Sequence, residues 1–282
     1  MKIGITMYSF HRDFAAGTID MQKFIEFAGV AGYDSCDLVA YFWKDREREM
    51  KEIPGWLKQA GVKLLTYAVG NKLLKHDKKE LEAQMEIVRD GIRTAGKLGA
   101  PYVRVFGGAD ITGFTSATAL DHVIDCFKSV MPLCREHNVT LGIENHGGYP
   151  GTSTEVKTVV EGVNDKHFTA LFDTGNFLAV DENPATAAQV LSGSVGLVHV
   201  KDMVRLPAMP EVPNSYKPAR APNRVKAVGI GEGEVPIKEC LQTLKKGGFD
   251  GYVTVEAEDE GDETSSAQAA LSYLRKLVAE LK

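Results

Sequence analysis

The chain has 282 residues, 44% of them hydrophobic and 25% charged, which is typical of a globular protein that forms one large α/β barrel or two ordinary domains. Its net charge of −5 offers no general attraction for nucleic acid or an anionic membrane, and no run approaches the roughly 18 apolar residues of a membrane span. The four cysteines show no metal-binding spacing and no signal-peptide pattern precedes the first apolar run, so we expect a reduced, cytoplasmic protein.

Short apolar runs typical of strands alternate along the chain with segments of helical periodicity. The expected strands are 2–8, 34–42, 62–70, 101–108, 139–145, 167–173, 194–202 and 251–258. The expected helices include 19–32, 44–60, 77–99, 116–137 and 264–280. Thr18 is the expected N-cap of the first helix, and the third, the clearest, is expected to begin at Asp77 and end at Gly99.

The alternation of strands and helices predicts a parallel sheet. Eight such units in a chain of this length predict a closed (β/α)8 TIM barrel, and we expect residues 1–282 to form a single domain. An open, doubly wound sheet is the main alternative. It usually has a glycine-rich turn after its first strand, and residues 7–14 are not such a turn.

One interval, residues 203–233, departs from this rhythm, with five prolines and little helical pattern. A connection of this length is usually functional or disordered. It leaves the same rim as the seventh strand and is rich in lysine and arginine, so it is either a lid or subunit contact or a solvated surface excursion. As a lid, its basic residues would favour an anionic sugar.

Four consecutive strands end on residues that can bind a metal ion: Glu144, Asp173, His199 and Glu256. In a (β/α)8 barrel these strand ends meet at the rim that holds the active site. A single acidic residue there is often a helix cap or an ion-pair partner, but three crowded carboxylates repel one another unless a cation lies between them. An oxygen-rich set without thiolates favours Mn²⁺, Mg²⁺ or Co²⁺ over Zn²⁺, so we expect one such ion.

Other polar residues near these strand ends are weaker candidates for binding a substrate. His146 follows Glu144 by two residues, and Arg104 lies within the fourth strand, where it can reach the cavity or pair with Asp37 or Glu144. Lys201 and Asp202 directly follow His199 and suit a supporting role around the ligands. Tyr8 can form a wall of a sugar pocket. The acidic run 256–263 is expected to be a solvated loop apart from Glu256.

Over essentially its whole length the chain resembles the xylose-isomerase-like TIM barrels, in particular D-tagatose 3-epimerase and related ketose 3-epimerases. The resemblance places the family's Glu, Asp, His, Glu metal set on the four strand-end residues and the acid/base pair on Glu144 and Glu256. It also implies that Arg205, six residues after the histidine, binds substrate oxygen. The epimerases have a substrate-binding histidine three residues after the aspartate, where this chain has Asn176; His146 is a candidate replacement.

The resemblance and the ligand set imply a metal-dependent sugar isomerase or epimerase that moves a proton beside a carbonyl through an enediolate. An inosose-dehydratase-type lyase and an enzyme of 3-keto-sugars or glycosides are the alternatives on the same scaffold. A nuclease is disfavoured because the rim has few histidines and the chain has no basic face, and a non-catalytic binder because the ligand set is intact. The expected partner is a small sugar or cyclitol, with no nucleic acid or membrane, and a homodimer or homotetramer is an open alternative.

Overall fold

The computed structural model describes residues 1–146, 148–206 and 224–281. Within them, eight parallel strands close into a barrel in the order β1-β10-β7-β6-β5-β4-β3-β2, which confirms the predicted fold. The barrel strands are β1 (Lys2–Thr6), β2 (Ser35–Val39), β3 (Lys63–Ala68), β4 (Tyr102–Val105), β5 (Thr140–Glu144), β6 (Phe168–Asp173), β7 (Val195–Val200) and β10 (Tyr252–Val255).

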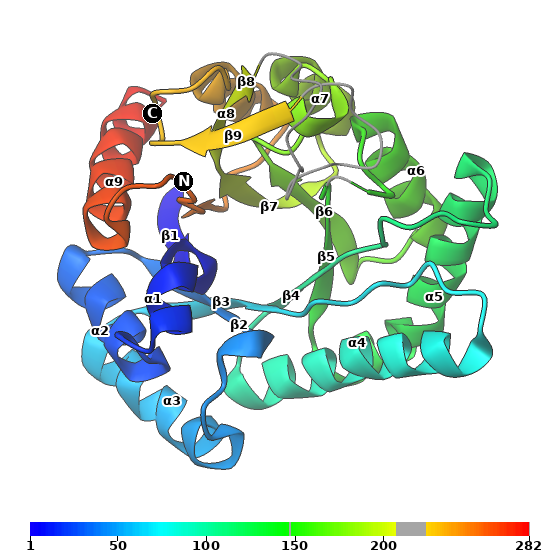
Figure 1. Ribbon diagram of the computed structural model, residues 1–282, viewed down its shortest axis with the longest axis horizontal. Coiled ribbons are helices and arrows are strands. Elements are labelled where there is room, and N and C mark those ends of the chain that lie inside the picture. Colours follow the sequence, from blue (N-terminus) through cyan, green and yellow to red (C-terminus); the bar gives the residue numbers. More distant parts are fainter. Residues whose placement is uncertain (147, 207–223, 282) are drawn as a thin grey trace.

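Helices surround the barrel and cover the outer faces of its strands (Figure 1). The α-helices are α1 (His11–Ala16), α2 (Met21–Ala31), α3 (Arg46–Ala60), α4 (Lys78–Leu98), α5 (Ser116–His137), α6 (Ser153–Val163), α7 (Pro184–Leu191), α8 (Ile237–Lys246) and α9 (Glu263–Glu280). Three short 3-10 turns, η1 (Met7–Phe10), η2 (Ala40–Phe42) and η3 (Leu178–Val180), follow β1, β2 and β6. None of the helices in the described residues is long and apolar enough to cross a membrane.

The main core lies between the strands and the helices, because a barrel strand buries both of its faces. Outward-facing residues such as Ile143, Phe172 and Val198 pack there against apolar faces of the helices. A second, small cluster of Leu65, Leu171 and Leu197 joins β3 to β6 and β7, which are not all neighbours in the sheet. These leucines meet across the barrel interior and fill the layer beneath the rim.

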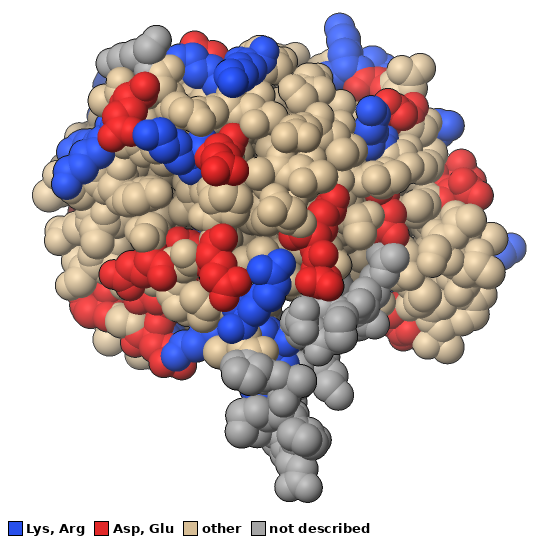
Figure 2. Space-filling view, turned by 90° about the horizontal axis from the view of Figure 1, so that it is seen from above, with Lys and Arg blue, Asp and Glu red and all other residues tan. Residues whose placement is uncertain are grey.

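The interval between β7 and β10 differs from its prediction. Instead of an irregular connection, its two ends form an antiparallel pair, β8 (Asp202–Leu206) and β9 (Arg224–Val228), visible beside α8 in Figure 1. The central part, 207–223, holds the five prolines and lies outside the described residues. Acidic and basic side chains are interspersed on the face shown in Figure 2.

Candidate metal centre and pocket

The four strand-end residues point into the barrel because side chains two residues apart share a face of a strand. Leu171 and Leu197 lie in the interior cluster, and Asp173 and His199 follow each of them by two residues. Asp173 and His199 are also direct partners in the register of β6 and β7. The pairing therefore places the carboxylate and the imidazole side by side above the leucine layer.

Glu144, Asp173, His199 and Glu256 come together in one buried group. One potential ligand atom from each lies within 4.8 Å of all the others. The structure thus brings the four sequence-predicted residues together, from β5, β6, β7 and the position directly after β10.

The unpaired atoms of this group test whether a cation fits. Among the described residues, one carboxylate oxygen of each acid (Glu144 Oε2, Asp173 Oδ2, Glu256 Oε2) and both ring nitrogens of His199 make no hydrogen bond. Buried polar atoms are normally hydrogen-bonded, since leaving one unpaired costs about 1–3 kcal/mol or more for a charged group. Three carboxylate oxygens and an imidazole nitrogen that lie close together without a hydrogen bond fit a single divalent ion.

The pKa values in this group show that its buried charges are unfavourable without a cation. Burial, opposed in part by the ammonium of Lys201, raises the pKa of Asp173 to about 8. Burial alone would lower the pKa of His199, but contacts with Asp37 and Glu256 and the charge of Glu144 raise it to about 10. Without a cation, Asp173 and His199 therefore hold protons at neutral pH, and these protons must leave when a metal binds.

Asp37 supports His199 from the opposite side of the barrel. Its Oδ2 lies 3.4 Å from His199 Nε2, while His199 Nδ1 lies 3.4 Å from Glu256 Oε2. A carboxylate behind a ligating histidine fixes the orientation of the ring and makes it a stronger ligand. The sequence suggested Asp37 only as one of two partners for Arg104. Arg104 approaches the other, Glu144, with 3.4 Å between Nη1 and Oε2.

Lys201 lies buried between three carboxylates. Its Nζ is 3.6 Å from Asp173, 3.1 Å from Glu256 and 2.8 Å from Glu258. Although burial raises the pKa of Glu256, the charges of Lys201 and His199 hold it well below its usual value. The expectation that the acidic run after Glu256 is solvated is thus wrong for Glu258, which is buried against a lysine.

Two asparagines join the ends of β5 and β6. The side-chain amide of Asn176 donates to Glu144 Oε1 over 3.1 Å, and its backbone amide donates to Asp173 Oδ1 over 2.8 Å. Asn145 donates to the Asp173 carbonyl and accepts from its backbone amide. These contacts fix the second oxygens of Glu144 and Asp173, so that the first ones face the centre.

A pocket of about 380 Å³ lies over this centre, within the size range of small-molecule sites. We call it the central pocket. It brings together the sequence-predicted Tyr8, Arg104, Glu144, His146 and Glu256. Apart from Tyr8, the sequence did not single out its aromatic walls. Its lining residues are Tyr8, His11, Tyr41, Phe42, Arg104, Phe106, Glu144, His146, Glu256 and Glu258.

Two predicted substrate-binding residues have other contacts. Asp202 accepts hydrogen bonds from the backbone amides of residues 203, 231, 233 and 235, so its carboxylate holds the glycine-rich segment after β9. Arg205 is paired with Glu234 (3.1 Å) and lies 3.8 Å from Asp181. Lys226 of the same interval is paired with Glu260, so the structure gives these two cations acidic partners within the chain.

Comparisons with known proteins agree with this architecture. Residues 25–277 match the family model of the xylose isomerase-like TIM barrel. The chain is 26% identical over 188 residues to L-ribulose-5-phosphate 3-epimerase UlaE of Salmonella paratyphi A, covering 66% of this chain and 60% of the relative. It is 23% identical over 164 residues to inosose dehydratase of Lacticaseibacillus casei, covering 58% and 53%. The chain thus spans little more than half the length of these two relatives.

Among solved structures, a crystal structure of the IolI protein with a bound zinc atom superposes with a TM-score of 0.84. The match covers all of this chain and 99% of the other at 16% sequence identity, so it shows a common fold. The family match over most of the sequence, the closed barrel and the four ligand-bearing strands lead to one conclusion. This chain belongs to the xylose isomerase-like TIM barrel family.

Proposed function

We propose that the protein is a divalent-metal-dependent sugar isomerase or epimerase that transfers a proton on a carbon beside a carbonyl group. The observation that carries the proposal is the buried group in which Glu144, Asp173, His199 and Glu256 each bring a potential ligand atom without a hydrogen bond to one place. The oxygen-rich donor set suits Mn²⁺, Mg²⁺ or Co²⁺. When bound, the ion acts as a Lewis acid that offsets the negative charge developing on the carbonyl oxygen.

In this proposal Glu144 and Glu256 move the proton. They belong to strands separated in the barrel by β6 and β7, so their carboxylates approach the central pocket from different sides. Glu256, kept charged by Lys201, removes the proton on carbon and leaves an enediolate. Glu144, protonated from solvent, donates its proton to the opposite face, which gives epimerisation, or to the next carbon, which gives isomerisation. Glu256 then releases the proton that it removed to solvent, which restores both groups.

Other residues hold the substrate and the two acids in place. Arg104 and Asn176 orient Glu144, and Lys201 orients Glu256. Tyr8 and His146 line the central pocket, where they can bind sugar hydroxyl groups. Arg205 would have to exchange its contacts with Glu234 and Asp181 for a substrate oxygen.

A lyase of the inosose dehydratase type is the second candidate, favoured by the dehydratase relative. It shares the first proton removal and differs in the second step. After the carbon-bound proton has gone, a hydroxyl group leaves from the adjacent carbon, and an acid in the pocket protonates it. Product analysis separates the two reactions, because only the lyase releases water and forms a carbon–carbon double bond.

The experiment is a solvent-exchange assay with Mn²⁺-loaded protein in D₂O on ketoses, inososes and 3-keto-glycosides. We expect deuterium beside the carbonyl of the true substrate, and Glu256→Gln should slow this exchange about 100-fold or more. Glu260→Gln, a change of the same kind at an exposed residue, is the matched control and should exchange at the wild-type rate. Turnover without solvent exchange would contradict the proposal and indicate a hydride shift or hydrolysis.

A further inference from the structure

We propose that a second pocket beside the metal centre is a subsite for another sugar unit, so that the substrate is a ketone-bearing sugar joined to a second sugar. This inference rests on the proposed function, because it takes the central pocket as the place of the reacting sugar. It adds the size and class of the substrate.

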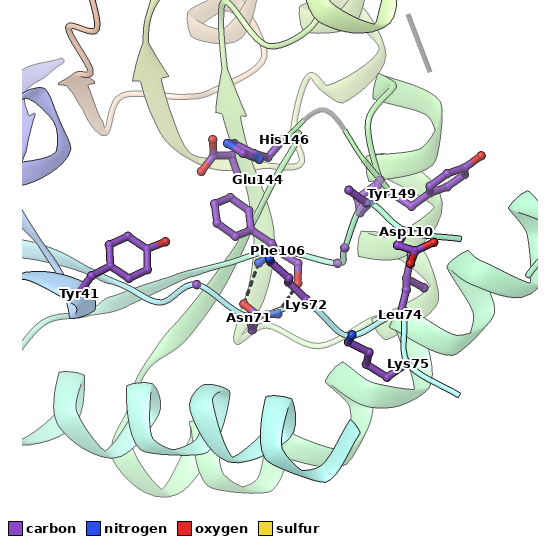
Figure 3. Close-up of a pocket in the computed structure, with 15 residues that line it drawn as sticks. Tyr41, Asn71, Lys72, Leu74, Lys75, Phe106, Asp110, Glu144, His146 and Tyr149 are labelled. Atoms are coloured by element: carbon purple, nitrogen blue, oxygen red, sulfur yellow. Dashed lines mark hydrogen bonds between the residues drawn. The ribbon is translucent and has the colours of Figure 1, made fainter. Parts of the chain in front are cut away.

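The second pocket, which we call the side pocket, has a volume of about 370 Å³ and adjoins the central pocket. Tyr41, Phe106, Glu144 and His146 line both, so a molecule can extend from one into the other. In Figure 3, Glu144 and His146 lie at one side of the side pocket, and Leu74, Asp110 and Tyr149 lie at its other end. Each pocket lies in the size range of a small-molecule site, and together they offer more room than a single monosaccharide uses.

The walls of the side pocket are held together by hydrogen bonds. The side chain of Asn71 pairs with both the amide and the carbonyl of Phe106, the amide of Leu73 donates to the carbonyl of Gly107, and the amide of Tyr149 donates to the carbonyl of Gly108. These bonds join the segments that follow β3, β4 and β5 at the same rim as the metal ligands.

Glycine is required where these segments meet. A Cβ atom on Gly107 would lie 2.0 Å from the Tyr149 carbonyl oxygen, and one on Gly148 would lie 2.3 Å from the Gly108 carbonyl oxygen. Both distances are far inside van der Waals contact with backbone atoms. The close approach and the bonds between segments make the side pocket a preformed cavity, so little ordering is needed when a ligand binds.

The lining has the mixture of surfaces that a sugar requires. Phe106 and Tyr149 offer apolar rings, and Tyr41, 56% exposed, offers an aromatic face where the two pockets join. Aromatic rings of this kind combine a large apolar area with low flexibility. Asp110 and the ammonium of Lys72 can bond to hydroxyl groups; within the described residues Lys72 has no carboxylate partner.

A phosphate group is a poorer match for the side pocket. Asp110 and Glu144 both line it and outnumber the lining lysine without a carboxylate partner in the described residues, Lys72, since Lys75 is already 3.4 Å from Glu80. A neutral, hydroxyl-rich ring avoids this repulsion and covers the apolar walls. The second sugar unit is therefore the occupant that the lining favours.

The test compares matched one-unit and two-unit sugars in two assays. In D₂O with Mn²⁺-loaded protein, kcat/KM for exchange is measured on D-fructose and on lactulose, which is fructose carrying a second sugar at O4. By calorimetry, Kd is measured for D-glucitol and lactitol, polyols that differ by the same second unit and have no carbonyl to react. We expect the two-unit member to be favoured about 10-fold or more in both assays.

Filling the side pocket should remove that preference. Ala109→Trp and Asp110→Trp should reduce the two-unit to one-unit ratio to below about 3-fold, whereas the small change Ala109→Ser should keep it. Two filling variants are used so that a failure of one to fold does not decide the result. Each variant's ratio is taken from its own pair of sugars, which cancels any general loss of activity.

The outcomes distinguish this inference from the proposed function. Tighter lactitol binding that Ala109→Trp abolishes supports the subsite even if no exchange is seen, and in that case the proposed reaction fails alone. Exchange on fructose without any preference for lactulose or lactitol overturns the subsite and leaves the reaction standing. A preference for fructose 6-phosphate over both sugars would also overturn it in favour of a phosphate site.

Discussion

Asp37 and Lys201 show how single residues contact the candidate metal ligands without belonging to that group. Asp37 holds one nitrogen of His199, and Lys201 neutralises part of the charge of Asp173 and Glu256. Both are buried, and removing either should have measurable effects that differ in sign.

Replacing Asp37 by asparagine should weaken metal binding. The change keeps the shape of the side chain but removes the charge that orients His199, and comparable losses behind a metal-bound histidine cost about 10- to 100-fold in affinity or activity. A Mn²⁺ titration of wild type and Asp37→Asn measures the effect. Equal affinities would show that Asp37 only fills space.

Replacing Lys201 by methionine should lower the stability of the metal-free protein but should not weaken metal binding. The variant leaves Asp173, Glu256 and Glu258 without their buried cation, and breaking such a group typically costs about 3–5 kcal/mol. Its melting temperature without metal should fall, and the rise on adding Mn²⁺ should exceed that of wild type, because less positive charge opposes the ion. Lys201→Arg, which keeps the charge, is the control, and an unchanged rise in Lys201→Met would contradict this role.

Protons should compete with the metal. The pKa values of Asp173, about 8, and His199, about 10, lie above their ordinary 3.8 and 6.5, so the folded protein without metal binds more protons than the unfolded chain. The stability that these two groups contribute to the metal-free fold is therefore lost as pH rises from about 6 to 9. Metal binding at pH 7 should release protons. Melting curves at both pH values, and calorimetry in buffers of different ionisation enthalpy, check this. Metal binding without proton release would contradict it.

The sequence predicts that these four side chains meet at one rim, and they do, because the end of a barrel strand is a fixed place. It does not predict the contacts of Asp37 and Glu258. Asp37 reaches His199 across the barrel, and Glu258 is buried because a lysine from another strand lies beside it. Such pairings depend on the closed barrel and leave no local signal.

At the scale of elements, the β8–β9 pair and the segment that follows it are held by one side chain. Asp202 accepts four backbone hydrogen bonds, and a Cβ atom on Gly233 would lie 2.1 Å from its Oδ1. The glycine-rich sequence after β9 thus wraps around a carboxylate of its own chain.

Asp202→Ala should therefore destabilise the protein without removing the metal. Hydrogen bonds to a charged group are worth about 1.5–3 kcal/mol each, and each kcal/mol lowers the melting temperature by about 2–4 °C in a chain of this size. With four such bonds lost, we expect a fall of about 10 °C or more, with one Mn²⁺ still bound per chain. Loss of metal without a change in melting temperature would place Asp202 in the centre instead.

The ends of a helix can be predicted from the sequence where a capping residue marks them. Asp77 and Gly99 bound α4 as expected, since each cap satisfies exposed backbone groups locally. The expected N-cap Thr18 is wrong, because Asp20, two residues later, accepts from the amide of Lys23. The β8–β9 pair was missed because its two strands are separated by a long proline-rich interval, and each is short and contains two charged residues.

At the scale of the whole molecule, the closed barrel follows from the repeated strand and helix pattern. The two pockets do not, because their walls depend on how the loops after β2, β3, β4 and β5 approach one another. The proposed function depends on a single feature, which is the convergence of four candidate ligands at one rim of the barrel.

The most direct test of this feature is a titration of metal-stripped protein with Mn²⁺, with free Mn²⁺ followed by electron paramagnetic resonance. We predict one tight site per chain in the wild type, and almost none in Asp173→Asn, which keeps the hydrogen-bonding shape but loses the ligand charge. The matched variant Asp110→Asn, at the rim but outside the ligand group, should bind as the wild type does. No tight site in the wild type, or the same site in Asp173→Asn, would contradict the metal centre.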